Sequence, residues 1–317
     1  MSKESNNQGR AYEYICLVTL EKEIKRIRPA EIEINSSYQA ALSAWEAIEE
    51  DLRATLIESA AAAVESIFEL EPLIVEDGTD MLTLSIQTDS KGEEGDVRDI
   101  LIVRRNIHWE IGLSVKHNHF AVKHSRLAKG LDFGKKWFGV KCSDEYWKAI
   151  TPIFSYLEEE KAKHTKWREL PSKENDVYIP LLTAFMDELK RSYKKNSDIP
   201  KKLVEYLLGK FDFYKVISID KKRTTQIQTF NLRGTLNKAS ASEQPKTLIP
   251  ISNLPTRIVS LEMKPESTNT VELYMDNGWQ FSFRIHNAET NVIPSLKFDI
   301  QIIGMPTTII SINCLWK

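Results

Sequence analysis

The stretch GDVRDILIVRRNIHWEIGLSVKHNH, residues 95–119, carries the clearest structural signal in the chain. Asp99 opens the apolar run 100–103, and a short turn leads into residues 109–116, where apolar and polar side chains alternate strictly. Alternation with a period of two is typical of a strand with one buried face. We therefore predict two neighbouring strands here, and a third at residues 82–87, where the same alternation occurs.

The segments on either side of these strands predict a mixed fold. Apolar side chains at helical spacing predict helices at 9–28 and 36–70, and more helices within 143–210. The basic segment 118–129 is expected to form a short helix. The last hundred residues are β-rich, with predicted strands at 213–219, 225–232, 256–263, 270–275, 279–286 and 296–303. The expected fold class is therefore mixed α+β and α/β, with an αβ core at 1–142, a helical region at 143–212 and a β-rich region at 213–317.

Composition excludes several classes of protein. The chain has 317 residues, of which 42% are hydrophobic and 28% charged, a balance that excludes wholesale disorder. No apolar run reaches the roughly 20 residues that a membrane-spanning helix needs. The three cysteines lie far apart, so neither a disulfide framework nor a CxxC zinc site is expected. The N-terminus lacks the apolar stretch of a signal peptide, and we expect a protein of the reducing cytoplasm without membrane partners.

Charge is distributed unevenly, although the formal net charge is only −2. Residues 1–90 hold 18 acidic side chains against 7 basic ones, whereas residues 104–141 hold 9 basic side chains against 2 acidic ones. Four of the six histidines also fall in the second segment. A basic block in an otherwise acidic chain indicates a polyanionic partner.

Residues 95–119 also place charged groups in a pattern typical of metal-dependent phosphodiester hydrolysis. Asp99 starts one strand and Lys116 ends the next; this chemistry needs carboxylates to hold Mg²⁺ and a cation near the attacking water. Residues two apart in a strand share a face, so an acid at position 114 would lie beside the lysine. The chain has Ser114 there. We expect the carbonyl of Val115 to supply a further oxygen ligand.

The second carboxylate of this site remains open between two residues. Glu110 shares the face of Lys116, but six residues of straight strand separate them by roughly 20 Å. Glu13 lies on the inward face of the first predicted helix and can pack against the sheet. Distance favours Glu13, and we expect Glu110 to pair with Arg104 or Arg105.

The basic segment after Lys116 suits contacts with phosphates. The expected contacts are His117, Asn118, His119, Lys123 and Arg126. A competing hypothesis is a metal site among the histidines between His108 and His124, since histidines at such spacing can bind zinc.

Near the C-terminus, residues 278–287 alternate again. Aromatic and aliphatic side chains occupy one face, and the other face carries the hydrogen-bonding side chains Gln280, Ser282, Arg284 and His286. An arginine on such a face suits the O6 and N7 atoms of guanine. We expect this strand to contact DNA bases.

Five segments together resemble the HaeIII-type restriction endonucleases, a family of the PD-(D/E)XK nuclease class. These segments are NNQGRAYEY, GDVRDI, WEIGLSVKHNHFAVKHSRL, GWQFSFRIHNA and PSLKFDIQIIGMP. The resemblance implies a PD-(D/E)XK core and Mg²⁺-dependent cleavage of double-stranded DNA at GGCC, leaving a phosphate on the downstream fragment. By position, Asp99 matches the metal-binding aspartate and Lys116 the motif lysine, while Ser114 departs from the motif acid. Asp96 competes with Asp99 because both precede the same strand.

The resemblance also implies a cognate DNA methyltransferase as functional counterpart. A palindromic target favours a two-fold dimer. Two other functions are weighed against this interpretation: a repair nuclease of the same fold, and a non-catalytic DNA-binding protein with a structural metal in the histidine cluster.

Overall fold

The computed structural model describes residues 3–76, 78–88 and 95–317. The chain divides into two compact units, which are described separately. The first unit comprises Met1–Phe120, Gly209–Ser252 and Thr307–Lys317, and the second comprises Ala121–Leu208 and Asn253–Pro306.

The first unit combines helices with a mixed sheet. Its helices are α1 (Lys3–Ile24), α2 (Ser36–Ala47), α3 (Glu50–Leu70) and α4 (Pro72–Val75), and short helical turns occur at Arg105–Ile107 and Asp220–Lys222. Its strands are β1 (Ala30–Ile32), β2 (Leu82–Ile86), β3 (Ile100–Arg104), β4 (Trp109–His117), β6 (Phe213–Ile219), β7 (Thr224–Phe230) and β12 (Ser311–Leu315).

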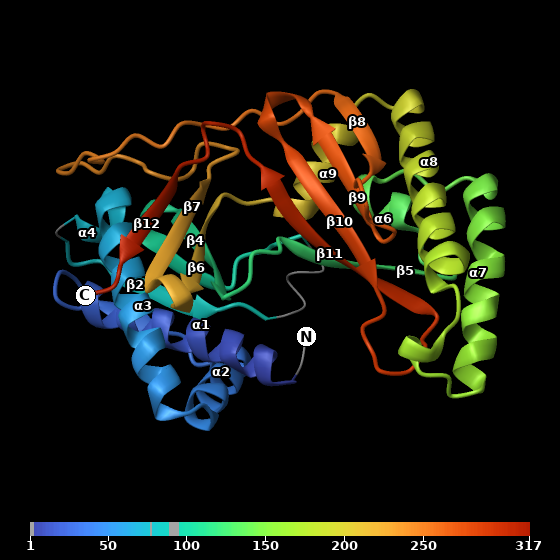
Figure 1. Cartoon of the computed structure of the whole chain (residues 1–317). Helices are drawn as coiled ribbons and strands as arrows, with labels where there is room; N and C mark the ends of the chain where they lie inside the picture. The colour runs from blue at the N-terminus through green and yellow to red at the C-terminus, as the bar shows by residue number, and fades with distance from the viewer. Residues whose placement is uncertain (1–2, 77, 89–94) are drawn as a thin grey trace. The chain divides into compact units, whose positions relative to one another are not determined.

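The order of the strands in this sheet is β1-β2-β3-β4-β6-β7-β12. The pairs β1/β2 and β4/β6 are parallel, and the other pairs are antiparallel. Helices α1, α2 and α3 pack together on one face of the sheet (Figure 1), and their apolar side chains join those of the strands in one core. Burying this apolar surface is the main stabilising term of the unit.

The second unit contains the remaining elements. Its helices are α6 (Phe133–Phe138), α7 (Asp144–Ala162), α8 (Ile179–Lys195) and α9 (Ile199–Leu208), with short turns at Trp167–Glu169, Glu174–Tyr178 and Asp276–Gly278. Its strands are β5 (Lys123–Ala128), β8 (Ile258–Met263), β9 (Thr270–Met275), β10 (Gln280–His286) and β11 (Ser295–Gly304).

These strands form a fully antiparallel sheet in the order β5-β11-β10-β9-β8. One face of this sheet is aromatic: Phe283 and Phe298 pack against Phe185 of α8 and Trp137 of α6. Helices α7 and α8 lie side by side (Figure 1). Because successive side chains of a strand point to opposite faces, the polar side chains of β10 lie on the face away from this aromatic core.

The predicted mixed helix-and-sheet class is confirmed, but several boundaries differ. The helix predicted at 36–70 is two helices, because Ile48 and Glu49 adopt extended backbone between them. The segment 118–129 contains a strand, β5, in place of the predicted short helix. The three consecutive domains expected at 1–142, 143–212 and 213–317 also differ from the compact units, because β6, β7 and β12 join the first sheet while β5 joins the second.

Among the described residues, no helix combines the length and the apolar composition needed to cross a membrane.

Candidate active site

The acid that precedes β3 and the lysine near the end of β4 lie side by side in the first unit. The antiparallel register pairs Ile100 with Leu113, and the backbone N–H of Asp99 donates to the carbonyl of Leu113 at 2.7 Å. Lys116 Nζ donates to Asp99 Oδ2 at 2.8 Å. The structure thus brings together the two residues that the sequence pattern singled out.

The Asp99 carboxylate is held through one of its oxygens. Besides Lys116, Oδ2 accepts the backbone N–H of Val115 at 2.7 Å and the Ser114 hydroxyl at 3.3 Å. Among the described residues, no hydrogen bond reaches Oδ1. A fixed carboxylate with one oxygen to spare is suited to a hard divalent cation, which prefers oxygen ligands.

Lys116 is held in its charged form by acidic neighbours. Burial lowers the pKa of its ammonium, but the adjacent Asp99 carboxylate and the more distant Glu13 carboxylate more than offset this, so the pKa lies above its ordinary value. About a quarter of each side chain of the Lys116–Asp99 pair remains exposed, 27% and 24% respectively. The pair is therefore accessible from solvent, and the Lys116 ammonium keeps its charge near neutral pH.

Glu13 belongs to α1, which packs against β4. Tyr12 and Leu17 of the same helix are fully buried and anchor it in the core, whereas Glu13 is half-buried, so its carboxylate lies at the margin of the core. The electrostatic effect of Glu13 on Lys116 places its charge within reach of the same site. A role of Glu13 as the second carboxylate remains a prediction.

Glu13→Gln is expected to lower Mg²⁺-dependent cleavage at least tenfold, because an amide is a poorer ligand for a hard cation than a carboxylate. Glu110→Gln is the matched control and should change the rate only a few-fold, since Glu110 is engaged elsewhere. Comparison of the two rates over a Mg²⁺ titration checks this. A larger defect in Glu110→Gln would reassign the second carboxylate.

Asp96 and Glu110, the two competing acids, are both bound by Arg98. Asp96 accepts from Arg98 Nε at 2.8 Å and from its Nη2 at 2.7 Å, and Glu110 accepts from Nη1 at 2.8 Å. Asp96 also accepts an amide hydrogen from Gln87. Burial would raise the pKa of Asp96, but the Arg98 and Gln87 hydrogen bonds outweigh it and the pKa is lowered. These acids thus belong to an ion-pair network separate from Lys116.

The expectation that Glu110 pairs with Arg104 or Arg105 was wrong. Arg104 instead binds Glu76 and Asp80. The Arg98 side chain crosses β4 at Gly112, where an added Cβ would collide with it. A glycine in the strand therefore makes room for the arginine that holds Glu110.

His117 and Asn118 are tied to Asp220, which follows β6. His117 Nε2 and the Asn118 amide lie 2.7 Å and 2.8 Å from Asp220 Oδ2, and Ser218 donates to Oδ1 at 2.8 Å. Burial opposes ionisation of Asp220, but these donors outweigh it and lower its pKa. In this structure the two side chains therefore bind Asp220 and connect the end of β4 to the end of β6. Their expected phosphate contacts remain a prediction, as does that of the half-buried His119.

The polar face predicted for residues 280–286 is present on β10. Its members alternate with the fully buried Phe281, Phe283 and Ile285. Arg284 keeps 56% of its side chain exposed, and its Nη2 donates to Asp299 Oδ2 on β11 at 3.2 Å. Burial, together with Arg284 and Lys297, lowers the pKa of His286, so this ring is neutral near pH 7. This face thus presents the Arg284 guanidinium, which Asp299 holds in place, and the neutral imidazole of His286.

The two basic residues of β5, Lys123 and Arg126, differ in how accessible they are. Lys123 Nζ donates to the carbonyl of Tyr206 at 2.8 Å and lies 4.0 Å from the centre of its ring. Burial, with a contribution from Lys136, lowers the pKa of Lys123 to about 8. Arg126 is exposed and lies 3.4 Å from the Ser295 hydroxyl. Lys123 is thus partly withdrawn from any phosphate, whereas Arg126 remains accessible.

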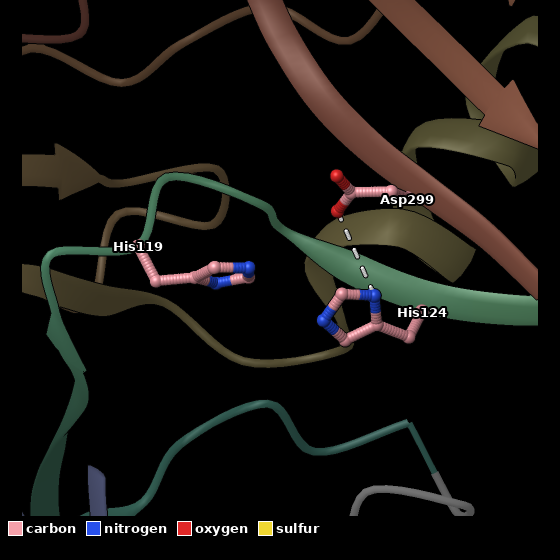
Figure 2. Close-up of side chains that lie close together, drawn as sticks. All are labelled: His119, His124 and Asp299. Carbon is pink, nitrogen blue, oxygen red and sulfur yellow. Dashed lines mark ion pairs between the residues drawn. The ribbon is translucent and has the colours of Figure 1, made fainter. Parts of the chain in front are cut away.

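The histidines between His108 and His124 are divided between the two units of the chain. His124 of β5 lies 3.7 Å from Asp299 of β11 (Figure 2), within the second unit. His119, also drawn there, belongs to the first unit, as does His117 with its Asp220 partner. Contacts within one unit therefore do not test the structural-metal hypothesis, which remains an alternative.

Several charged residues near these sites could not be predicted from the sequence. Arg98 lies two residues after Asp96, but its ion pair with Glu110 depends on the pairing of β3 with β4, which brings Glu110 close. Lys215 appears within the apolar run of β6, and its charge was the one available signal. Asp220 and Asp299 carry no motif of their own.

The chain belongs to the HaeIII restriction endonuclease family, because the model of that family matches residues 9–306. It is 53% identical to the type II restriction enzyme HaeIII of Haemophilus aegyptius, and the alignment covers 100% of both chains. It is thus a full-length relative of that enzyme that differs from it at nearly half of the aligned positions. No solved structure matches the chain.

Proposed function

We propose that the chain is a Mg²⁺-dependent type II restriction endonuclease that hydrolyses double-stranded DNA at GGCC on a PD-(D/E)XK core. The observation that carries this proposal is the contact of Lys116 Nζ with Asp99 Oδ2 at the ends of two paired strands. Family membership supports the activity, and the resemblance of the motif to the nuclease class supports the metal and the target sequence. A cytoplasmic location is proposed as well, which agrees with the free state of all three cysteines.

The oxygen atoms at the site fit a magnesium ion. Asp99 Oδ1, the Glu13 carboxylate and the carbonyl of Val115 are the proposed ligands, and carboxylate and carbonyl oxygens are what Mg²⁺ prefers. When bound, the ion would polarise the phosphate and lower the pKa of a coordinated water. Ser114, which donates to Asp99, helps to orient the carboxylate in place of supplying a ligand.

Lys116 is proposed to stabilise the charge that develops during hydrolysis. Its ammonium is already oriented by Asp99, so little reorganisation is needed when the phosphate binds. A preorganised cation at this point stabilises the transition state more than the ground state, because negative charge on the phosphate oxygens and the attacking water increases along the reaction.

The proposed DNA contacts follow the polar faces described above. Arg284, aimed by Asp299, suits the O6 and N7 atoms of guanine, and the neighbouring polar side chains of β10 contribute further hydrogen bonds. Arg126 suits a phosphate. A homodimer is proposed because a palindromic target presents two equivalent half-sites, and a methyltransferase of the same specificity would protect the host DNA.

Arg284→Ala is expected to reduce cognate binding by roughly 1–3 kcal/mol and to leave the affinity for a scrambled duplex nearly unchanged, because a bidentate arginine–guanine contact discriminates between bases. Binding of the variant to both duplexes should be measured at one fixed salt concentration. Equal loss for both duplexes would make Arg284 a phosphate contact. Unchanged binding to both would identify a solvent-facing strand.

A plasmid cleavage assay with and without Mg²⁺ tests the function as a whole. Discrete fragments that map to GGCC, absent in EDTA and absent from methylated DNA, are expected. Nicking without a sequence pattern would favour a repair nuclease. Binding of DNA without any cleavage would favour the non-catalytic DNA-binding protein with a structural metal.

A further inference from the structure

A lysine in the middle of β6 is buried close to the candidate active site. Lys215 is only 3% exposed and stands within the otherwise apolar or small run Phe213–Ile219. Burying an ammonium group is costly unless a partner or a ligand compensates for it. A charged residue kept at such a position suggests a task that an apolar residue could not perform.

The pairing of the strands places Lys215 next to the departure from the nuclease motif. In the parallel β4/β6 pair, Lys215 is the partner of Ser114, and Ile217 is the partner of Lys116. Paired residues share a face of the sheet, so Lys215 stands beside Ser114 on the face that carries Lys116. The charges of Lys116 and Asp99 both act on Lys215. Its Nζ donates to the backbone carbonyl of Phe120 at 2.7 Å.

The surroundings of Lys215 favour the arrival of an anion. Burial is the main cause of a pKa lowered to about 7, and the Lys116 ammonium lowers it further, although Asp99 acts in the opposite direction. A phosphate diester entering beside the two lysines would add negative charge to that of the Asp99 carboxylate, which already acts on Lys215. A carboxylate at position 114 would pair with Lys215 and withdraw it from such a ligand, whereas the uncharged Ser114 does not.

We propose that Lys215 is a second active-site lysine, which contacts the scissile phosphate beside Ser114 and neutralises part of its charge. On this proposal Ser114 and Lys215 act together. The nuclease motif has a carboxylate at position 114, whereas this chain has an uncharged serine there and a lysine beside it that contacts the substrate. This inference rests on the proposed function, because it requires that a phosphodiester binds at Asp99 and Lys116.

Lys215→Met provides the test, because methionine fills a similar volume without the charge. We expect the variant to melt at the same temperature as the wild type or higher, since replacing a buried charge with an apolar group is often neutral or stabilising. Single-turnover cleavage of GGCC-containing DNA should fall at least ~10²-fold. Lys215→Arg restores the positive charge and should cleave at about a tenth of the wild-type rate or faster.

A second measurement does not depend on cleavage. The affinity for the cognate duplex without Mg²⁺ should be measured over a range of salt, where loss of one phosphate contact reduces the slope of log K against log salt by about 0.9. Gln228→Met is the matched control, because Gln228 is the buried partner of Lys215 on the other side, on β7. It should keep both the slope and the rate.

Wild-type cleavage and an unchanged salt slope in Lys215→Met would overturn the proposal. A lower melting temperature with an unchanged slope would also overturn it and make Lys215 a structural tie to Phe120. If the wild type itself fails to cut GGCC, the proposed function fails, and the salt slopes of the wild type and Lys215→Met still decide whether Lys215 contacts a phosphate.

Discussion

Replacement of Lys116 by alanine should reduce single-turnover cleavage of cognate DNA at least ~10²-fold, because it removes a preoriented charge from the reacting phosphate. Binding of the duplex should change far less, since one contact among many is lost. The variant also leaves Asp99 Oδ2 with the Val115 amide and the Ser114 hydroxyl as donors, so the carboxylate stays in place. Rates at saturating enzyme and affinities without Mg²⁺ separate the two effects.

Lys222→Ala serves as the control for loss of a positive charge, because Lys222 is an exposed lysine of the same unit in the turn after β6. It should cut at the wild-type rate. If Lys116→Ala also cut at that rate, the motif lysine would be misassigned. A defect that disappeared at saturating enzyme would make Lys116 a residue of DNA binding and not of the chemical step.

The neighbourhood of Asp99 and Lys116 was predictable because it is local in the chain. Both residues belong to one hairpin, in which alternation fixes the faces and the short turn fixes the partner strand. The strands β2, β3 and β4 were therefore found within a residue or two. The same local argument assigned the buried and polar faces of β10, where Phe283 and Arg284 point in opposite directions.

Contacts between distant segments were not predictable from the sequence. Lys215 meets Ser114 through a parallel pairing across about a hundred residues, which no local pattern encodes. The basic segment 118–129 becomes β5 because it pairs with β11, far along the chain, and this pairing overrides its local preference. No proline or glycine marks the boundary between α2 and α3. The first turn of α3 contains Glu50 and Asp51, and acidic side chains stabilise a helix N-terminus.

Asp99 and Asp96 provide the sharpest contrast between an acid proposed to be catalytic and a structural one. Asp99→Asn should abolish Mg²⁺-dependent cleavage, by at least ~10²-fold, because a neutral amide is a poorer ligand and no longer holds the charge of Lys116. The fold should tolerate the change, since the side chain is partly exposed and an amide oxygen can still accept the Val115 N–H. Metal binding followed by calorimetry should weaken in parallel.

Asp96→Asn should have the opposite profile. Asp96 and Arg98 are 8% and 5% exposed, and the loss of the Asp96 charge weakens two buried hydrogen bonds of Arg98, whose remaining carboxylate partner is Glu110. We expect a cost of roughly 1–3 kcal/mol for the variant. Its melting temperature should therefore fall, while the cleavage rate below that temperature stays within a few-fold of the wild type. Cleavage and thermal melting of both variants check this contrast. An inactive Asp96→Asn beside an active Asp99→Asn would move the metal site to the Arg98 network, and Lys116 would then lose the carboxylate on which its proposed role depends.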